Sequence, residues 1–512
     1  MLVKTYAGAV HGIDAITVTV ETDVSDGVNF YMVGLPDNAV KESQQRIETA
    51  LRSTGYRLPG KKIVVNMAPA DLKKEGSAYD LAIAIGILGA SGQINSEHIG
   101  EYIILGELSL DGSINPVKGA LPIAIQALHE NYKGVILPAR NAREAAVVNN
   151  IVVYGVSNIQ EVISIFEGVP TIGPTVVDTR KEFFADYQSI DLDFADVKGQ
   201  LTVKRALEIA AAGGHNVIMI GPPGSGKTML SKRIPSILPP FTLRESLETT
   251  KIHSVAGTLP SDSALMTRRP FRAPHHTISD VALVGGGTFP QPGEISLAHN
   301  GVLFLDELPE FKRQVLEVLR QPLEDREITI SRARSTVNYP AGFMLVASMN
   351  PCPCGYYNDP NKECTCPPGA VKKYLSKISG PLLDRIDLHV EVVPVPFNDL
   401  ALQGRGESSE EIRARVVKAR EIQRKRFENM DGIHCNAQMS SGKIRSICVL
   451  DDAGMTLIKK AMEKFQLSAR AYDRILKVAR TIADLAGSEQ ICSNHVAEAI
   501  TYRSLDRETW GI

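Results

Sequence analysis

The period of the hydrophobic pattern divides this chain into segments. In the first part of the chain, stretches that alternate between apolar and polar residues, such as 15–24, are mixed with stretches of helical spacing, such as 78–91. Alternation is typical of strands and a period near 3.6 is typical of helices, so we expect an α/β domain over residues 1–170. Residues 171–194 lose this periodicity and gather Pro, Gly and Asp, which predicts a linker.

From residue 195 to 395, short apolar runs end in polar residues and are separated by helical stretches. This pattern favours an α/β core that has a parallel sheet and a site at the carboxyl edge of its strands. The pattern over residues 396–512 predicts successive helices, which we expect to form a helical lid. The expected fold class is therefore α/β, with about three domains in a chain of 512 residues.

The apolar run 217–220 leads directly into a glycine-rich turn and a helix-permissive stretch. The residues of the turn and of the start of the helix-permissive stretch are Gly221, Pro222, Pro223, Gly224, Ser225, Gly226, Lys227 and Thr228. Such a turn aims backbone amides at a triphosphate, while the lysine reaches the β and γ phosphates and the threonine hydroxyl holds Mg²⁺. The sequence therefore predicts a phosphate-binding loop that takes ATP and magnesium.

Two further apolar runs end in polar residues that suit the same chemistry. The run 301–305 is followed by Asp306 and Glu307, and the run 343–349 is followed by Asn350. We expect Asp306 to bind magnesium and Glu307 to polarise the attacking water. The Asn350 amide is expected to orient that water or to touch the γ phosphate.

Composition narrows the remaining possibilities. The formal net charge is only -2, so contacts with nucleic acid have to come from local patches. The chain has no run of 18 apolar residues, and its start lacks the pattern of a secretory signal. We therefore expect a cytoplasmic protein that has no membrane partner.

Four of the seven cysteines fall within fifteen residues, on a loop rich in Pro and Gly over 350–369. They are Cys352, Cys354, Cys364 and Cys366. In a cytosolic chain, four thiols on one loop favour a structural zinc site over two disulfides. The C-x-C spacing is tighter than the usual C-x2-C, which leaves free or redox-active thiols as the alternative.

With these residues assembled, the chain resembles the Mg-chelatase-like AAA+ ATPases of the bacterial ComM/YifB group over almost its full length. The segments that carry the resemblance, beside the phosphate loop, are FRAPHHTIS (271–279), GEISLAHNGVLFLDELPEF (293–311), NPCPCGYY (350–357), SGPLLDRIDLHVEV (379–392) and LSARAYDRILKVARTIADL (467–485). The resemblance implies an AAA+ core followed by the helical lid, and it implies a ring of identical subunits, expected to be a homohexamer.

The same resemblance assigns roles to arginines. Arg385 matches the arginine finger that reaches the γ phosphate held by a neighbouring subunit, a role that requires an oligomer. Arg470 matches the lid arginine that senses nucleotide within its own chain, with Arg474 as the second choice. The alternative for each is an ordinary surface salt bridge.

The resemblance also implies two insertions, one around 270–295 and one hairpin before the Asn350 strand. In the hairpin, Arg332 and Arg334 are spaced so that both project to one face, and they are candidates for contacts to the DNA backbone in a central pore. A solvent-exposed hairpin tip is the alternative. A second basic stretch, 413–426, favours a helix with one buried face and a solvated basic face.

The first domain resembles the proteolytic domain of Lon ATP-dependent proteases, without its catalytic pair. The position of the nucleophilic serine falls on Ala78, and that of the catalytic lysine falls on Ile123. Ser77 and Lys118 lie nearby in sequence, but a serine has to lie within hydrogen-bond reach of its base to be activated. Proteolysis is therefore disfavoured, and the domain is left to bind DNA or a partner, or to organise the ring.

The function that the resemblance implies is an ATP-driven ring acting on single-stranded and branched DNA. In particular, it implies a branch-migration helicase that serves recombination and natural transformation, with recombination proteins as partners. A magnesium-chelatase-like metal insertase, an ATP-driven protease or remodelling protein, and a scaffold that only binds ATP are the alternatives. His275 and His276 are expected to lie at a subunit interface, with DNA contact or packing left open.

Overall fold

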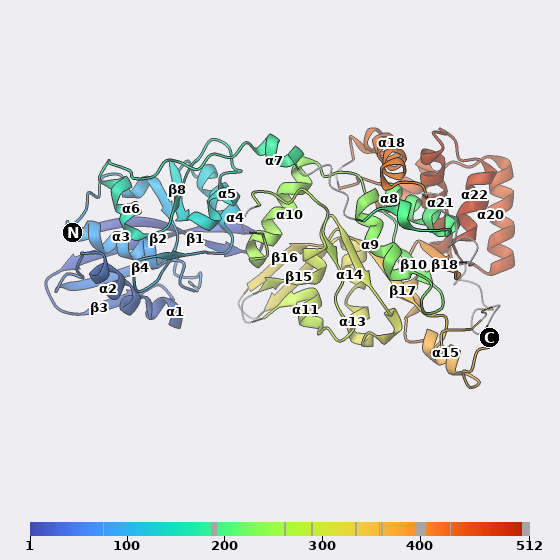
Figure 1. Ribbon diagram of the computed structural model, residues 1–512, viewed down its shortest axis with the longest axis horizontal. Coiled ribbons are helices and arrows are strands. Elements are labelled where there is room, and N and C mark those ends of the chain that lie inside the picture. Colours follow the sequence, from blue (N-terminus) through green and yellow to red (C-terminus); the bar gives the residue numbers. More distant parts are fainter. Residues whose placement is uncertain are drawn as a thin grey trace. The chain divides into compact units, whose positions relative to one another are not determined.

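The computed structural model describes residues 1–74, 76–185, 192–260, 263–287, 290–332, 335–357, 359, 362–395, 406–430 and 432–503. The chain divides into two compact units (Figure 1). The first contains residues 1–187, 242–267 and 290–292, and the second contains 188–241, 268–289 and 293–512. The α/β fold class predicted from the sequence is confirmed in both.

The first unit is built around a mixed seven-stranded sheet of order β3-β4-β2-β1-β5-β8-β9. The strands of this unit are β1 (Leu2–His11), β2 (Asp14–Ser25), β3 (Phe30–Val33), β4 (Lys62–Ala68), β5 (Tyr102–Ile104), β6 (Glu107–Leu108), β7 (Ile114–Asn115), β8 (Gly134–Pro138), β9 (Val152–Val156) and β13 (Gln291–Pro292). Its helices are α1 (Asn38–Lys41), α2 (Ser43–Ser53), α3 (Asp80–Ala90), η1 (Ile99–Glu101), α4 (Ala120–His129), α5 (Ala139–Ala145), α6 (Ile159–Phe166), α7 (Thr179–Ala185) and α10 (Leu243–Ala256). Helix α3 packs against β1 and β2, and all of its residues are buried, as expected for a helix that is apolar on every side.

Helix α10 is the main departure from the sequence-based organisation, because residues 242–267 fall within the predicted ATPase core but belong to the first unit. The helix packs against α4. The Ser254 hydroxyl donates to the buried Glu144 carboxylate, and the Ser254 carbonyl accepts from the Gly119 amide at 3.1 Å. Burial raises the pKa of Glu144, and the hydrogen bonds from Ser254 and Leu121 partly counteract that rise. These polar contacts, together with the helix packing, hold the segment in the first unit.

The second unit is built around a five-stranded parallel sheet of order β11-β14-β17-β10-β18. The strands of this unit are β10 (Val217–Ile220), β11 (Phe271–Arg272), β12 (Gly285–Gly286), β14 (Val302–Leu305), β15 (Glu327–Arg332), β16 (Ser335–Pro340), β17 (Met344–Met349) and β18 (Leu388–Glu391). The helices up to β18 are η2 (Phe194–Asp196), α8 (Leu201–Gly213), α9 (Lys227–Ile237), α11 (Asp280–Val284), α12 (Glu294–Leu297), η3 (Leu308–Glu310), α13 (Arg313–Glu317), α14 (Arg320–Asp325), α15 (Ala370–Leu375) and α16 (Gly380–Leu383). The runs that were predicted to be strands are therefore neighbours that point the same way.

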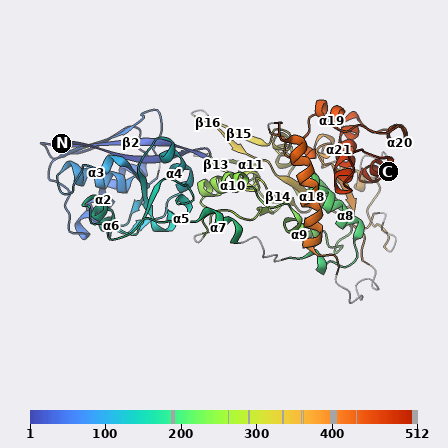
Figure 2. The same cartoon turned by 90° about the horizontal axis from the view of Figure 1, so that it is seen from above.

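The C-terminal helices share one hydrophobic core with the sheet. They are α18 (Ser409–Phe427), η4 (Asn436–Gln438), α19 (Ser441–Ile447), α20 (Asp452–Phe465), α21 (Ala469–Leu485) and α22 (Ser493–Thr501). Helices α18, α21 and α8 pack against one another (Figure 2). Among the described residues, none of the helices combines the length and the apolar character needed to cross a membrane.

Helix α18 carries the basic stretch 413–426, and one of its faces is buried, as the pattern predicts. Ile412, Val416 and Ala419 lie in the core. On its other faces, Arg415 pairs with Glu208 and Glu407, and Arg426 pairs with the buried Asp484. Ion pairs of Arg415 and Arg426 thus hold this helix against the rest of its own unit.

Candidate nucleotide-binding site

The phosphate loop joins β10 to α9 at the carboxyl edge of the parallel sheet. Gly224 and Gly226 adopt the left-handed backbone region, with φ of 76° and 91°. At Gly221, an added Cβ would lie 2.2 Å from the carbonyl oxygen of Val392, which follows β18. A side chain at Gly221 is therefore excluded by the backbone of the neighbouring strand.

Lys227 lies at the start of α9 and is mostly buried. Its Nζ donates to the carbonyls of Gly221 and Pro222 at 2.7 and 2.9 Å, and it lies 3.3 Å from Asn350 Oδ1. Burial lowers the pKa of this ammonium, while Asp306 and Glu307 act to raise it. The structure thus brings the lysine and the amide together, as expected from two strands that lie side by side.

Asp306 follows β14 and forms the centre of a small polar cluster. The Thr228 hydroxyl donates to its Oδ2 at 2.7 Å, and the Ser348 hydroxyl donates to its Oδ1. A hydroxyl and a carboxylate at this separation are the oxygen ligands that Mg²⁺ takes beside a nucleotide. Sequence reasoning missed Ser348, which lies two residues before Asn350 on β17.

Glu307 turns the chain away from β14, with a left-handed backbone φ of 53° that is uncommon outside glycine. Its side chain is 57% exposed, and His276 Nδ1 lies 3.7 Å from its Oε2. The rings of His275 and His276 lie 4.0 Å apart. The structure therefore places His276 beside the carboxylate that was predicted to polarise water.

The predicted arginines differ in their surroundings. The Arg385 side chain is only 9% exposed, with Nη2 2.5 Å from Glu324 Oε1 and Nη1 donating to the Pro381 carbonyl at 2.6 Å. If Arg385 acts on a neighbouring subunit, it has to exchange Glu324 for phosphate oxygens. Sequence reasoning did not identify Glu324, which is on α14.

Arg470 is 65% exposed and pairs with Asp384 at 3.0 Å. Arg474 instead pairs with Asp387 at 3.0 Å, in the interior. Burial by itself would raise the pKa of Asp387, but Arg474 and His215 lower it far below its usual value. Arg474 is thus committed to its own core, which leaves Arg470 as the candidate lid arginine.

The four clustered cysteines lie together on the loop after β17. All four Sγ atoms are within 4.8 Å of one another. Three of the separations are 3.3 Å (Cys352 to Cys354), 3.5 Å (Cys354 to Cys364) and 3.7 Å (Cys352 to Cys364). Tetrahedral zinc with Zn–S bonds of about 2.3 Å sets its sulfurs about 3.8 Å apart, so the cluster is close to the size that zinc requires.

The hairpin predicted before the Asn350 strand is confirmed. Strands β15 and β16 pair antiparallel, from Glu327 opposite Pro340 to Arg332 opposite Ser335. Arg334 lies outside the described residues, and Arg332 is described only in its backbone. Their contact with DNA stays a prediction.

The first unit holds no serine–lysine pair at the positions compared with Lon proteases. Ile123 is buried in α4, where its side chain occupies the space beside Gly8. Ser77 donates to the Glu107 carboxylate, and the Lys118 side chain lies over Gly257. Neither Ala78 nor Ile123 supplies a nucleophile or a base.

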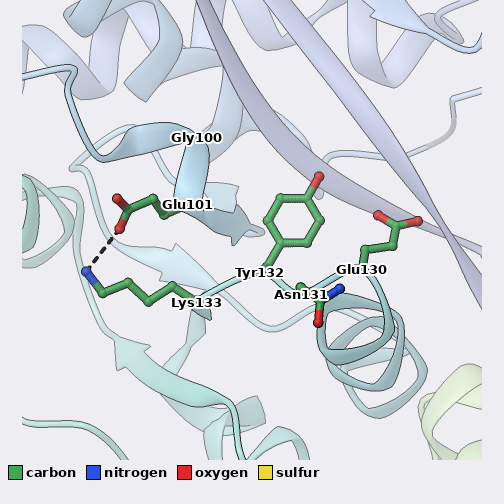
Figure 3. Close-up of a pocket in the computed structure, with 6 residues that line it drawn as sticks. All are labelled: Gly100, Glu101, Glu130, Asn131, Tyr132 and Lys133. Atoms are coloured by element: carbon green, nitrogen blue, oxygen red, sulfur yellow. Dashed lines mark hydrogen bonds and ion pairs between the residues drawn. The ribbon is translucent and has the colours of Figure 1, made fainter.

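A surface hollow of about 590 Å³ in the first unit lies between η1 and the turn after α4 (Figure 3). Its lining residues are Gly100, Glu101, Glu130, Asn131, Tyr132 and Lys133. The Lys133 ammonium pairs with Glu101 at 3.0 Å, while Glu130 accepts hydrogen bonds from Thr17 and Gln126. No residue of the phosphate loop lines it.

Three family models match the chain. Residues 193–400 match magnesium chelatase subunit ChlI, residues 20–141 match a second model of subunit ChlI of Mg-chelatase, and residues 406–503 match the ChlI C-terminal model. A 158-residue stretch is 30% identical to Lon protease 2 of Bacillus subtilis, over 27% of this chain and 26% of that protein.

Relatives that align over nearly the full length define the family of the chain more narrowly. It is 45% identical to competence protein ComM of Haemophilus influenzae over 505 residues, which cover 98% of this chain and 97% of the relative. It is 43% identical to the uncharacterized protein YifB of Escherichia coli over 498 residues, which cover 97% and 96%. The phosphate loop and the adjacent carboxylates Asp306 and Glu307 fit the family that these relatives indicate. The chain belongs to the ComM/YifB group of Mg-chelatase-like ATPases.

Proposed function

We propose that this ATPase is a motor that assembles as a homohexameric ring and drives branch migration of DNA. The observation that carries the ATPase activity is the convergence of Lys227, Asp306 and Asn350 at the carboxyl edge of three adjacent parallel strands. The DNA half is supported by the similarity to a protein named for competence and by the β15–β16 hairpin.

In this mechanism each residue has a separate task. The amides of the phosphate loop and Lys227 hold the triphosphate. Thr228 and Asp306 would hold Mg²⁺, which would neutralise charge on the phosphates when bound. Glu307 and Asn350 position and polarise the water, while Arg470 contacts nucleotide in its own chain. Arg385 of the next protomer stabilises the charge that develops on the γ phosphate, so hydrolysis is coupled to ring movement.

Branch migration is the direct test of the motor. With three-stranded and four-stranded DNA, the wild-type chain is expected to move the branch point only when ATP is hydrolysed. Lys227→Ala is expected to abolish the movement, because it removes the ammonium that neutralises the phosphates. Gel separation of the DNA products measures the outcome. If neither substrate were processed while ATP turnover stayed intact, a metal insertase or another remodelling activity would replace this proposal.

We further propose that Cys352, Cys354, Cys364 and Cys366 bind one structural zinc ion. Their mutual distances support it, and disulfide pairing is not needed to bring them together. The purified chain is expected to carry about one zinc per polypeptide, measured by atomic emission. Cys364→Ser should lower the zinc content to near zero, whereas Cys492→Ser, outside the cluster, should preserve it. Equal zinc loss in both variants, or none in either, would contradict the assignment.

A further inference from the structure

The loop that carries the four clustered cysteines, residues 350–369 (the cysteine loop), contacts the nucleotide site at two points. The first is Asn350. This residue directly follows β17 and lies two positions before Cys352, which is fully buried. Its Oδ1 is 3.3 Å from Lys227 Nζ. Fixing Cys352 therefore fixes the backbone that carries a proposed water-positioning amide.

The second contact joins the loop to the phosphate loop itself. Gly355 lies directly over Pro223: an added Cβ would be 2.5 Å from Pro223 Cδ and 2.8 Å from Cγ. The Gly355 amide donates to the Cys352 carbonyl at 3.0 Å, and its backbone is left-handed with φ of 88°. The tight turn that brings Cys352 and Cys354 together thus also sets Gly355 against the proline ring.

We infer that the metal-bound cysteine loop is a brace for the phosphate loop. This inference rests on the proposed ATPase function and on the proposed zinc site. Metal binding joins both ends of the loop, Cys352 and Cys354 on one side and Cys364 and Cys366 on the other. It therefore holds Gly355 against Pro223 and holds Asn350 beside Lys227. Loss of the metal loosens both contacts, so ATP binds more weakly and is hydrolysed more slowly.

Two alanine substitutions separate this contact from the cost of a left-handed backbone. Gly355→Ala puts a methyl group against Pro223, whereas Gly369→Ala has a similar φ of 78° and nothing within 4 Å. Both variants keep all four thiols. Gly355→Ala is expected to weaken the binding of a fluorescent ATP analogue about tenfold and to slow turnover, while Gly369→Ala stays within about twofold of wild type. Thermal melting and zinc content, expected to match between the two, report on folding.

Metal removal supplies the second arm. Chelation of zinc from the wild-type chain should weaken ATP binding, and added zinc should restore it. In Gly355→Ala the same treatment should change ATP affinity much less, because the braced contact is already lost and the two effects are not additive.

The outcomes are distinguishable. A wild-type chain that carries zinc, with Gly355→Ala binding ATP as Gly369→Ala does, overturns the brace while leaving the zinc site intact. A chain without zinc, unaffected by chelation, overturns the metal assignment and the brace with it. Absence of ATP binding in the folded wild-type chain overturns the proposed function.

Discussion

Glu307→Gln is expected to lower ATP turnover by at least about 100-fold while ATP binding stays within about twofold. The amide keeps the size of the side chain but cannot polarise water as a carboxylate does. Glu307 is 57% exposed, and its carboxylate lies 3.7 Å from His276 Nδ1, so the substitution should leave packing undisturbed. Phosphate release and the binding of a fluorescent ATP analogue measure the two quantities.

Glu310→Gln is the matched control. Glu310 ends η3, only three residues further along, and pairs with Lys377 at 3.5 Å on the surface. Its loss should change turnover by no more than about twofold, as is usual for an exposed ion pair. Unchanged turnover in Glu307→Gln would show that another group activates the water.

Arg385→Ala is expected to lower turnover by on the order of 10³-fold, with ATP binding retained, because a guanidinium at the γ phosphate acts mainly in the transition state. The structure offers a competing explanation, since Arg385 also pairs with Glu324 in its own chain. Glu324→Gln breaks that pair without touching Arg385. Turnover should then remain within about twofold of wild type, measured by phosphate release. A loss in Glu324→Gln as large as in Arg385→Ala would assign Arg385 to a structural role.

Three strands of the ATPase sheet, β10, β14 and β17, and the phosphate loop were predictable because their signals are local. Each strand is a short apolar run, and Asp306, Glu307 and Asn350 follow such runs directly. Parallel neighbours then bring the ends together without further information. The left-handed backbone of Glu307 could not be predicted from the order of apolar and polar residues, because it results from the turn into η3.

Two hydrogen-bond donors to carboxylates, Ser348 and Ser254, were not predictable, because each comes from a distant part of the chain. Ser348 reaches Asp306 across 42 residues, and Ser254 reaches Glu144 across 110. The residues of α10 fit a helix in either unit, and its packing against α4 and its hydrogen bonds to Glu144 and Gly119 assign it to the first. A single sequence carries no signal for such pairs.

The claim that adjacent protomers share each nucleotide is tested most directly by mixing two inactive variants. Glu307→Gln retains the arginine and Arg385→Ala retains the carboxylate, so a mixed ring contains some complete sites. With random assembly of equal amounts, about a quarter of the interfaces pair an intact Glu307 with an intact Arg385, and turnover should recover to about a quarter of the wild-type rate. A mixture as inactive as its components, although the subunits exchange, would contradict a shared site.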